Sequence, residues 1–169
     1  MTLIRTVLLR ENQLQKGGAE LIDRWRGDSE DRLWVDIQDP VQEIIEPLLE
    51  ERFGFHELAA EDTLSANTLP KYDSFATHAF FIFRAVELTP GAHSCNVTKM
   101  AAFLGNTFLF TIHNASVRAI DDVMGRINGD RRLIENGHDF LLYAIVDQLV
   151  DSHFPLLDDI EERVEQLQE

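Results

Sequence analysis

The sequence predicts an α/β (α+β) sandwich, in which helices flank a mixed sheet and a long acidic helix follows. Three observations carry this prediction. Strand-like and helix-like segments are mixed through the first two-thirds of the chain, three aromatic-rich strands follow one another after residue 78, and residues 138–169 contain no glycine. We therefore expect an α/β domain over residues 1–136 and a long kinked helix over residues 137–169.

The N-terminal third alternates short strands and helices. Its segments are, in order, a strand over 3–9, a turn over 12–18, a segment at 20–26 that fits either a short helix or a strand, and a buried strand over 33–37. A helix follows, because Asp39 is a good N-cap, Pro40 suits the first helical turn, and apolar residues recur at helical spacing until Gly54.

The middle of the chain predicts a second short helix and then three strands. The helix covers 57–64, with His56 helping to start it, and Pro70 makes the following residues a connector. The strands are expected at 78–88, 97–104 and 108–113, with turn signals at 90–91 and 105–106 between them. A helix from about 116 to 127 ends at the Asn-Gly pair that follows it.

Residues 138–169 are predicted to form one long helix, since apolar residues recur there at helical spacings. Pro155 should kink this helix near Asp151, because proline lacks a backbone donor and clashes with the preceding turn. The segment carries nine acidic residues and one formal cation, Arg163, and so supplies −8 of the net charge of −15. It ends still in helical register, which is typical of a helix that continues past residue 169.

Composition narrows the classes of function. Hydrophobic residues make up 44% and charged residues 27% of the chain, as in ordinary globular proteins. Fifteen basic against thirty acidic residues oppose binding to a phosphate backbone, so we expect no nucleic-acid partner. The same negative charge permits binding of divalent cations without demonstrating it.

The single cysteine and the hydropathy of the chain bear on its compartment. Cys95, expected in a strand, excludes an internal disulfide and a cysteine-rich zinc site. The N-terminus lacks the pattern of a secretion signal, and no stretch approaches the roughly 18 apolar residues needed to span a bilayer. These residues as they stand are expected to be soluble and cytoplasmic.

The sequence shows no motif for catalysis. The six histidines have no spacing that would place two imidazoles on one helix face, and neither a Gly-x-Ser-x-Gly elbow nor a Walker-type phosphate loop is present. We therefore expect a protein that is not an enzyme.

Three stretches together resemble the cytosolic part of the CorA family of divalent-cation transporters. The stretches are Trp-Val-Asp-Ile at 34–37 followed by Asp-Pro, Phe-His-Glu-Leu-Ala-Ala-Glu-Asp at 55–62 followed by Pro-Lys at 70–71, and Leu-Leu-Tyr-Ala-Ile-Val-Asp-Gln-Leu-Val-Asp at 141–151 followed by Phe-Pro. Glu57 stands where the family often has proline, and Leu69 where it usually has arginine. The resemblance covers the chain from about residue 33 onward.

The resemblance implies a regulatory metal site at Glu61, Asp62 and Asp147, shared between neighbouring subunits and completed by an acid from a later stalk helix. The implied cation is Mg²⁺, with Zn²⁺, Co²⁺ or Ni²⁺ as alternatives. The implied assembly is a homo-oligomer, a pentamer in the full-length protein. It would be attached to the cytoplasmic face of the inner membrane by helices that follow residue 169 and carry a Gly-Met-Asn motif.

Other interpretations of the same residues remain open. Adjacent acids such as Glu61 and Asp62 are commonly just a solvated helix face. A soluble metal-dependent hydrolase using Asp36, Glu61 and Asp62 would have a preformed site inside one subunit. A coiled-coil scaffold built on residues 138–169 would form oligomers whose stability does not depend on Mg²⁺.

Overall fold

The computed structural model describes residues 1–27, 30–89 and 94–166, and its centre is a seven-stranded sheet in the order β2-β1-β3-β7-β6-β5-β4. The strands are β1 (Leu3–Arg10), β2 (Gln13–Gly17), β3 (Arg32–Gln38), β4 (Lys71–Ser74), β5 (His78–Thr89), β6 (Ser94–Gly105) and β7 (Phe108–His113). Only β3 and β7 pair in parallel; the other neighbours are antiparallel. The predicted mixed sheet is therefore confirmed.

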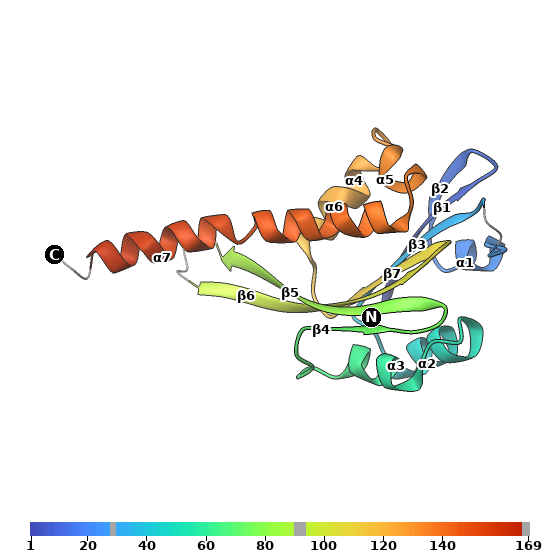
Figure 1. Ribbon diagram of the computed structural model, residues 1–169, viewed down its shortest axis with the longest axis horizontal. Coiled ribbons are helices and arrows are strands. Elements are labelled where there is room, and N and C mark those ends of the chain that lie inside the picture. The colour runs from blue at the N-terminus through green and yellow to red at the C-terminus, as the bar shows by residue number, and fades with distance from the viewer. Residues whose placement is uncertain (28–29, 90–93, 167–169) are drawn as a thin grey trace.

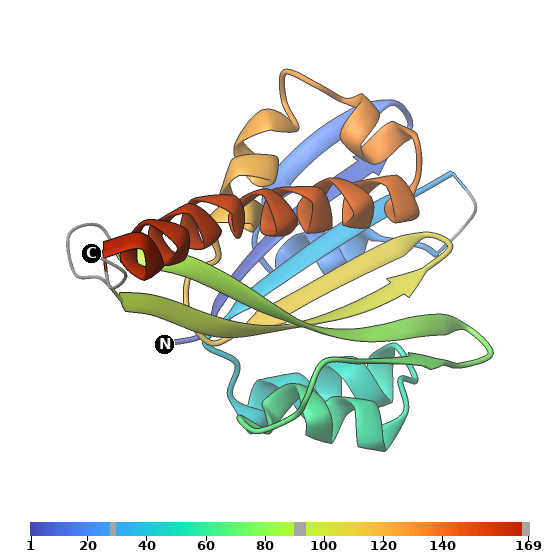
Figure 2. The same cartoon turned by 60° about the vertical axis from the view of Figure 1, so that its left-hand side comes forward.

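Helices cover both faces of this sheet (Figures 1 and 2). One face carries α1 (Glu20–Arg24), α2 (Gln42–Glu46), the π-helical turn η1 (Pro47–Arg52) and α3 (Glu57–Leu64). The other carries α4 (Arg118–Arg126), α5 (Arg132–Glu135) and α6 (His138–Asp151). The two layers of helices make the predicted sandwich.

Each face has its own hydrophobic core, because successive side chains of a strand point to opposite faces. In β3, Leu33, Val35 and Ile37 pack with α1, α2 and α3, whereas Trp34 packs with α4, α5 and α6. Trp34 is completely buried. Burial of such a side chain stabilises the fold by about 1.5–3 kcal/mol.

The structure confirms the predicted strand meander and the short helix α3, and corrects two local predictions. The stretch expected as a turn over 12–18 is strand β2, and the turn itself lies at Glu11 and Asn12, which have φ of 50° and 61° as tight hairpin turns require. Asp39 is not an N-cap: its φ is 53°, its backbone N–H donates to the His113 carbonyl, and the helix begins after Val41. The predicted turn at 90–91 lies outside the described residues.

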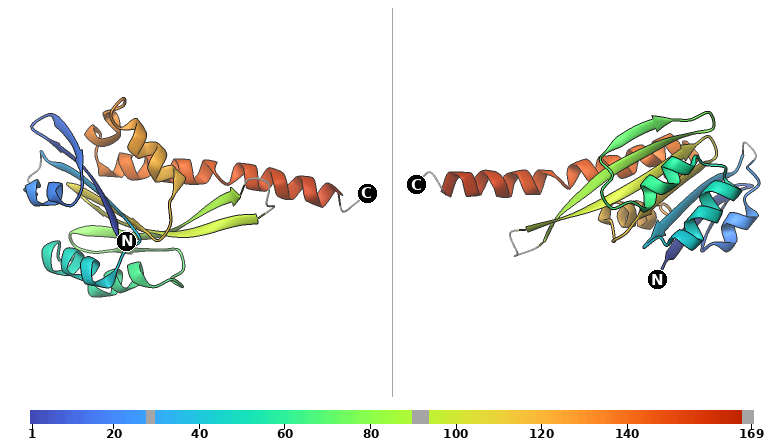
Figure 3. Two further views of the ribbon diagram at one scale, coloured as in Figure 1. Left: turned by 180° about the vertical axis from the view of Figure 1, so that it is seen from behind. Right: turned by 90° about the horizontal axis from the view of Figure 1, so that it is seen from below.

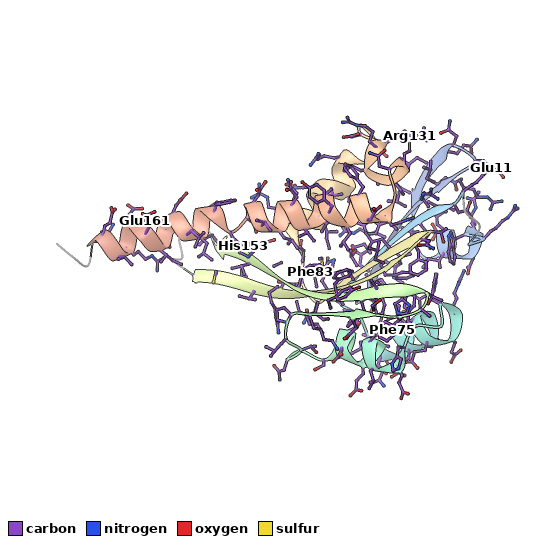
Figure 4. All side chains as sticks on the ribbon, viewed as in Figure 1. Glu11, Phe75, Phe83, Arg131, His153 and Glu161 are labelled. Carbon is purple, nitrogen blue, oxygen red and sulfur yellow. The ribbon has the colours of Figure 1, made fainter. Side chains whose placement is uncertain are left out.

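The expected long helix is interrupted at the predicted place. Helix α6 ends at Asp151 and α7 (Phe154–Gln166) begins after two intervening residues, with Pro155 in its first turn. His153, labelled in Figure 4, lies at this junction. Helix α7 projects beyond the sheet, as Figure 3 shows, and none of its described side chains is buried.

Contrary to the expectation from sequence, residues 138–166 contain an 18-residue window of mean hydropathy 1.2, which by length and composition alone is enough to cross a membrane. Core helices of soluble domains pass the same test. In α6 the apolar residues Leu141, Ile145 and Leu149 are buried against the sheet and α4. Packing in the core accounts for these three residues, while only 22% of the apolar window is buried.

Candidate metal site

Helix α3 presents the two adjacent acids on its outer side. His56 caps the helix, because its Nδ1 accepts a hydrogen bond of 3.2 Å from the Leu58 backbone N–H. The inner side packs in the core through Ala59, Ala60 and Thr63. Glu61 is consequently exposed, and in the described part of the chain it makes no ion pair, whereas Asp62 is half-buried.

The Asp62 carboxylate already has a cationic partner. Lys71 Nζ lies 2.5 Å from Asp62 Oδ2 and 2.8 Å from Asp73 Oδ2, so one ammonium bridges two carboxylates. Hydrogen bonds to Asp62 and then to Asp73 raise the pKa of Lys71 above its ordinary value. The ammonium is therefore held in the charged form.

A second lysine holds the backbone beneath Asp62. Lys99, on β6, is 4% exposed, and its Nζ donates hydrogen bonds of 2.7 Å to the carbonyls of Asp62 and Thr63 and a further one to that of Ser65. Burial, and secondarily the charge of Arg84, lower the pKa of Lys99 to about 8. The ammonium is thus still charged at neutral pH and offsets the negative end of the α3 dipole.

Sequence reasoning did not find this role of Lys99. The one signal was a cation that stands immediately before a run of apolar residues, 100–104, in a predicted strand. A lysine in such a place is rarely buried without polar partners.

Asp147 lies on the opposite face of the sheet. It is an exposed residue of α6, and the oxygen of the Tyr143 hydroxyl lies 3.5 Å from its Oδ1. Glu61 and Asp62 belong to α3, which covers the other face (Figure 1). One subunit therefore does not bring the three predicted ligands together, and in the described residues no three His, Cys, Asp or Glu side chains are grouped to hold a metal.

Asp36, the third acid of the hydrolase hypothesis, belongs neither to α3, which carries Glu61 and Asp62, nor to α6, which carries Asp147. It is fully buried on β3 and accepts hydrogen bonds from Arg5 (2.6 and 2.9 Å) and Thr111 (2.6 Å). His113 Nε2 lies 2.9 Å from Asp36 Oδ1, while His113 Nδ1 lies 2.6 Å from the Ala115 carbonyl. Both ring nitrogens face acceptors, an arrangement that favours the doubly protonated, cationic form of His113.

The contacts in this buried cluster shift the pKa values of both Asp36 and His113. Burial alone would raise the pKa of Asp36, but the hydrogen bond and charge of His113, with that of Arg5, lower it below its ordinary value. Burial alone would lower the pKa of His113, but Asp36 raises it. Since β3 alternates, Asp36 points toward the α4 face, away from α3. A preformed site made of Asp36, Glu61 and Asp62 is not present.

Comparison with known proteins identifies the family. The family model for CorA-like Mg²⁺ transporter protein matches residues 29–169. The chain belongs to this family. YfjQ of Bacillus subtilis, named as a metal ion transporter, is 30% identical over 136 residues, which are 80% of this chain and 41% of that protein. The cobalt/magnesium transport protein CorA of Thermotoga maritima is 27% identical over 143 residues, 84% of this chain and 41% of that protein.

Three solved structures share this fold. The soluble domain of CorA from Methanocaldococcus jannaschii superposes with a TM-score of 0.71 at 22% identity, over 98% of this chain and 62% of that one. The ZntB cytoplasmic domain from Vibrio parahaemolyticus superposes with a TM-score of 0.74 at 13% identity, over 98% of this chain and 65% of that one. Full-length CmaX superposes with a TM-score of 0.81 at 20% identity, over 99% of this chain and 51% of that one.

The chain spans about two-fifths of the length of the two curated relatives described above. It corresponds to a domain of a family of divalent-cation transporters, not of a family of enzymes.

Proposed function

We propose that this domain is the cytosolic cation sensor of a CorA-like divalent-cation transporter, and that Mg²⁺ is the sensed ion. The observation that carries the proposal is the placement of the acids: Glu61 and Asp62 lie on one face of the sheet and Asp147 on the other, all accessible to solvent. A cation cannot bridge them within a subunit. It can do so where the α3 face of one copy meets the α6 face of the next.

In this proposal the subunits form a ring, a homopentamer on the cytoplasmic face of the inner membrane, above a pore contributed by the sequence that follows. Mg²⁺ is a hard cation that prefers carboxylate oxygens, and Zn²⁺, Co²⁺ or Ni²⁺ are alternative ions for the same acids. Bound cation offsets the repulsion between acidic neighbours and holds a closed, symmetric ring. When cation is depleted, the net charge of −15 per chain loosens the ring and favours conduction.

The test is cation inhibition of transport by the full-length protein. Glu61→Ala and Asp62→Ala should each weaken inhibition by intracellular Mg²⁺, since each removes a ligand for the ion that closes the ring. An Asp122→Ala variant, which changes an exposed acid of α4 by the same substitution, is the matched control and should be inhibited normally. Normal inhibition of both α3 variants would refute the proposed function.

A coiled-coil scaffold is the second candidate, and one observation favours it. Helix α7 leaves Phe154, Leu157, Ile160 and Val164 about half exposed or more, and they recur at three- and four-residue spacings along the helix. Such a stripe suits contact with other helices. A scaffold held only by this stripe would melt at the same temperature with and without Mg²⁺, whereas the sensor would melt higher with Mg²⁺.

A further inference from the structure

Lys71 occupies the place that a cation would take beside Asp62. Its ammonium lies 2.5 Å from one carboxylate oxygen and 2.8 Å from another, of Asp62 and Asp73, and 5.6 Å from the centroid of the Phe80 ring. Two acids and one aromatic face thus surround a single positive charge. Carboxylate oxygens around one positive charge are also the arrangement that a divalent ion prefers.

The backbone that carries Asp62 is fixed. The buried ammonium of Lys99 binds three consecutive or near-consecutive carbonyls at the end of α3, including that of Asp62 itself. The Thr68 hydroxyl donates a further hydrogen bond of 3.2 Å to the Asp62 carbonyl. The backbone of Asp62 therefore cannot shift with an arriving cation unless the end of α3 comes apart.

Lys71 is the partner that is free to leave. It is the first residue of the four-residue edge strand β4, and its side chain is 36% exposed, more than the 28% of Asp62, the acid at which it would be displaced. A flexible four-carbon stem lets its ammonium move into solvent without movement of the backbone.

From this geometry we propose that Lys71 is a built-in competitor for the divalent cation at Asp62, so that the sensor binds its ion only by displacing this ammonium. The inference rests on the proposed function and adds to it a residue that sets the cation concentration at which the sensor responds. Lys71 then acts on the threshold of the response without being a ligand.

The expected size follows from the strength of the ion pairs. Partly exposed pairs contribute modestly, because solvent screens them, and Lys71 makes two. Removing its charge should therefore lower the Mg²⁺ concentration that half-inhibits transport about three- to tenfold. Lys71→Arg keeps a cation at the same place and should leave that concentration close to the wild-type value.

The experiment measures half-inhibition by Mg²⁺ in the full-length protein with Lys71→Met and Lys71→Gln. The chain has three lysines, and Lys16→Met is the matched control, because Lys16 donates to the Met124 carbonyl on the α4 face, far from Asp62. Melting curves in EDTA show whether each variant is folded. If Lys71→Met does not fold, Lys71→Gln, which keeps a hydrogen-bond donor, gives the same reading.

The Mg²⁺ concentration that half-inhibits transport, the threshold, should be lowered in both Lys71 variants and unchanged in Lys16→Met. When Asp62→Asn is also present, Lys71→Met should no longer change it. If Asp62→Asn alone abolishes inhibition while folded Lys71 variants keep the wild-type threshold or raise it, the inference on Lys71 is wrong and the proposed function stands. If Asp62→Asn is inhibited like the wild type, the role of Lys71 fails, and the proposed function fails with it when Glu61→Ala is also inhibited normally.

Discussion

Replacing Asp36 by Asn should cost the fold about 3–5 kcal/mol, the range found when one partner of a buried ion pair is removed. Asn keeps the shape and one acceptor oxygen, so the change removes charge with little change in volume. It leaves His113, whose side chain is fully buried, without the carboxylate that favours its cationic form, and deprives Arg5 of one of its two carboxylate partners. Arg5 retains Asp121 at 2.6 Å, which limits its share of the loss.

The assay is urea unfolding followed by far-UV circular dichroism and by the fluorescence of Trp34 in a Trp25→Phe background, because the chain has two tryptophans. The Trp34 indole donates a 3.1 Å hydrogen bond to Thr111, which itself donates to Asp36, so it reports on the cluster directly. For a chain of this length, the loss corresponds to a melting temperature lowered by roughly 6–20 °C. Asp122→Asn, at an exposed acid with a 3.6 Å ion pair, is the control and should change stability by less than about 0.5 kcal/mol.

The pH dependence of stability is a second test of the same cluster. The pKa of His113 is raised in the folded protein, so its stabilising contribution is complete below its unfolded pKa near 6.5 and is lost as the pH rises through the folded value. Asp36→Asn should weaken this alkaline loss. A cost below about 1 kcal/mol, with the alkaline loss unchanged, would refute the reasoning that these charges stabilise one another.

Three further changes test other parts of the structure. Lys99→Met leaves three carbonyls at the end of α3 without their donor and should cost about 2–4 kcal/mol in urea unfolding; a neutral result would show that Lys99 does not fix α3. Burial, and then the charge of Arg32, lower the pKa of His138 to about 4. About 3 kcal/mol of stability should therefore be lost as the pH falls from 6.5 toward 4. His138→Phe should reduce this loss of stability at acid pH. His56→Ala removes the N-cap of α3 and should lower stability by about 1 kcal/mol in thermal melts, while an unchanged melting temperature would mean that the cap is not needed.

The parts of the fold that were predictable from sequence are those set by neighbouring residues. Strands β5, β6 and β7 follow one another along the chain, and α3 begins at its own cap, so local patterns were sufficient to predict them. Asp39 was mistaken for a cap, because its positive φ accompanies a bond to His113, a residue 74 positions away. No local pattern carries that contact.

The charged residues of the structure show the same division. The sequence predicted that His113 ends a strand, but its partner Asp36 is 77 positions away, and the two meet only because β3 and β7 pair in parallel. Glu61, Asp62 and Asp147 were assigned to one shared site through the family resemblance. Their placement on opposite faces of the sheet could not be read from their spacing, since it depends on which face each helix covers.

The central claim is that the cation bridges two subunits, and complementation between variants tests it most directly. A subunit carrying Glu61→Gln and Asp62→Asn keeps Asp147, and a subunit carrying Asp147→Asn keeps the two acids of α3. Each variant alone should lose inhibition of transport by Mg²⁺, and co-expression should restore part of it, because intact acids then face each other at some interfaces of the mixed ring. Mixed oligomers no more sensitive to Mg²⁺ than either variant alone would contradict a site shared between subunits.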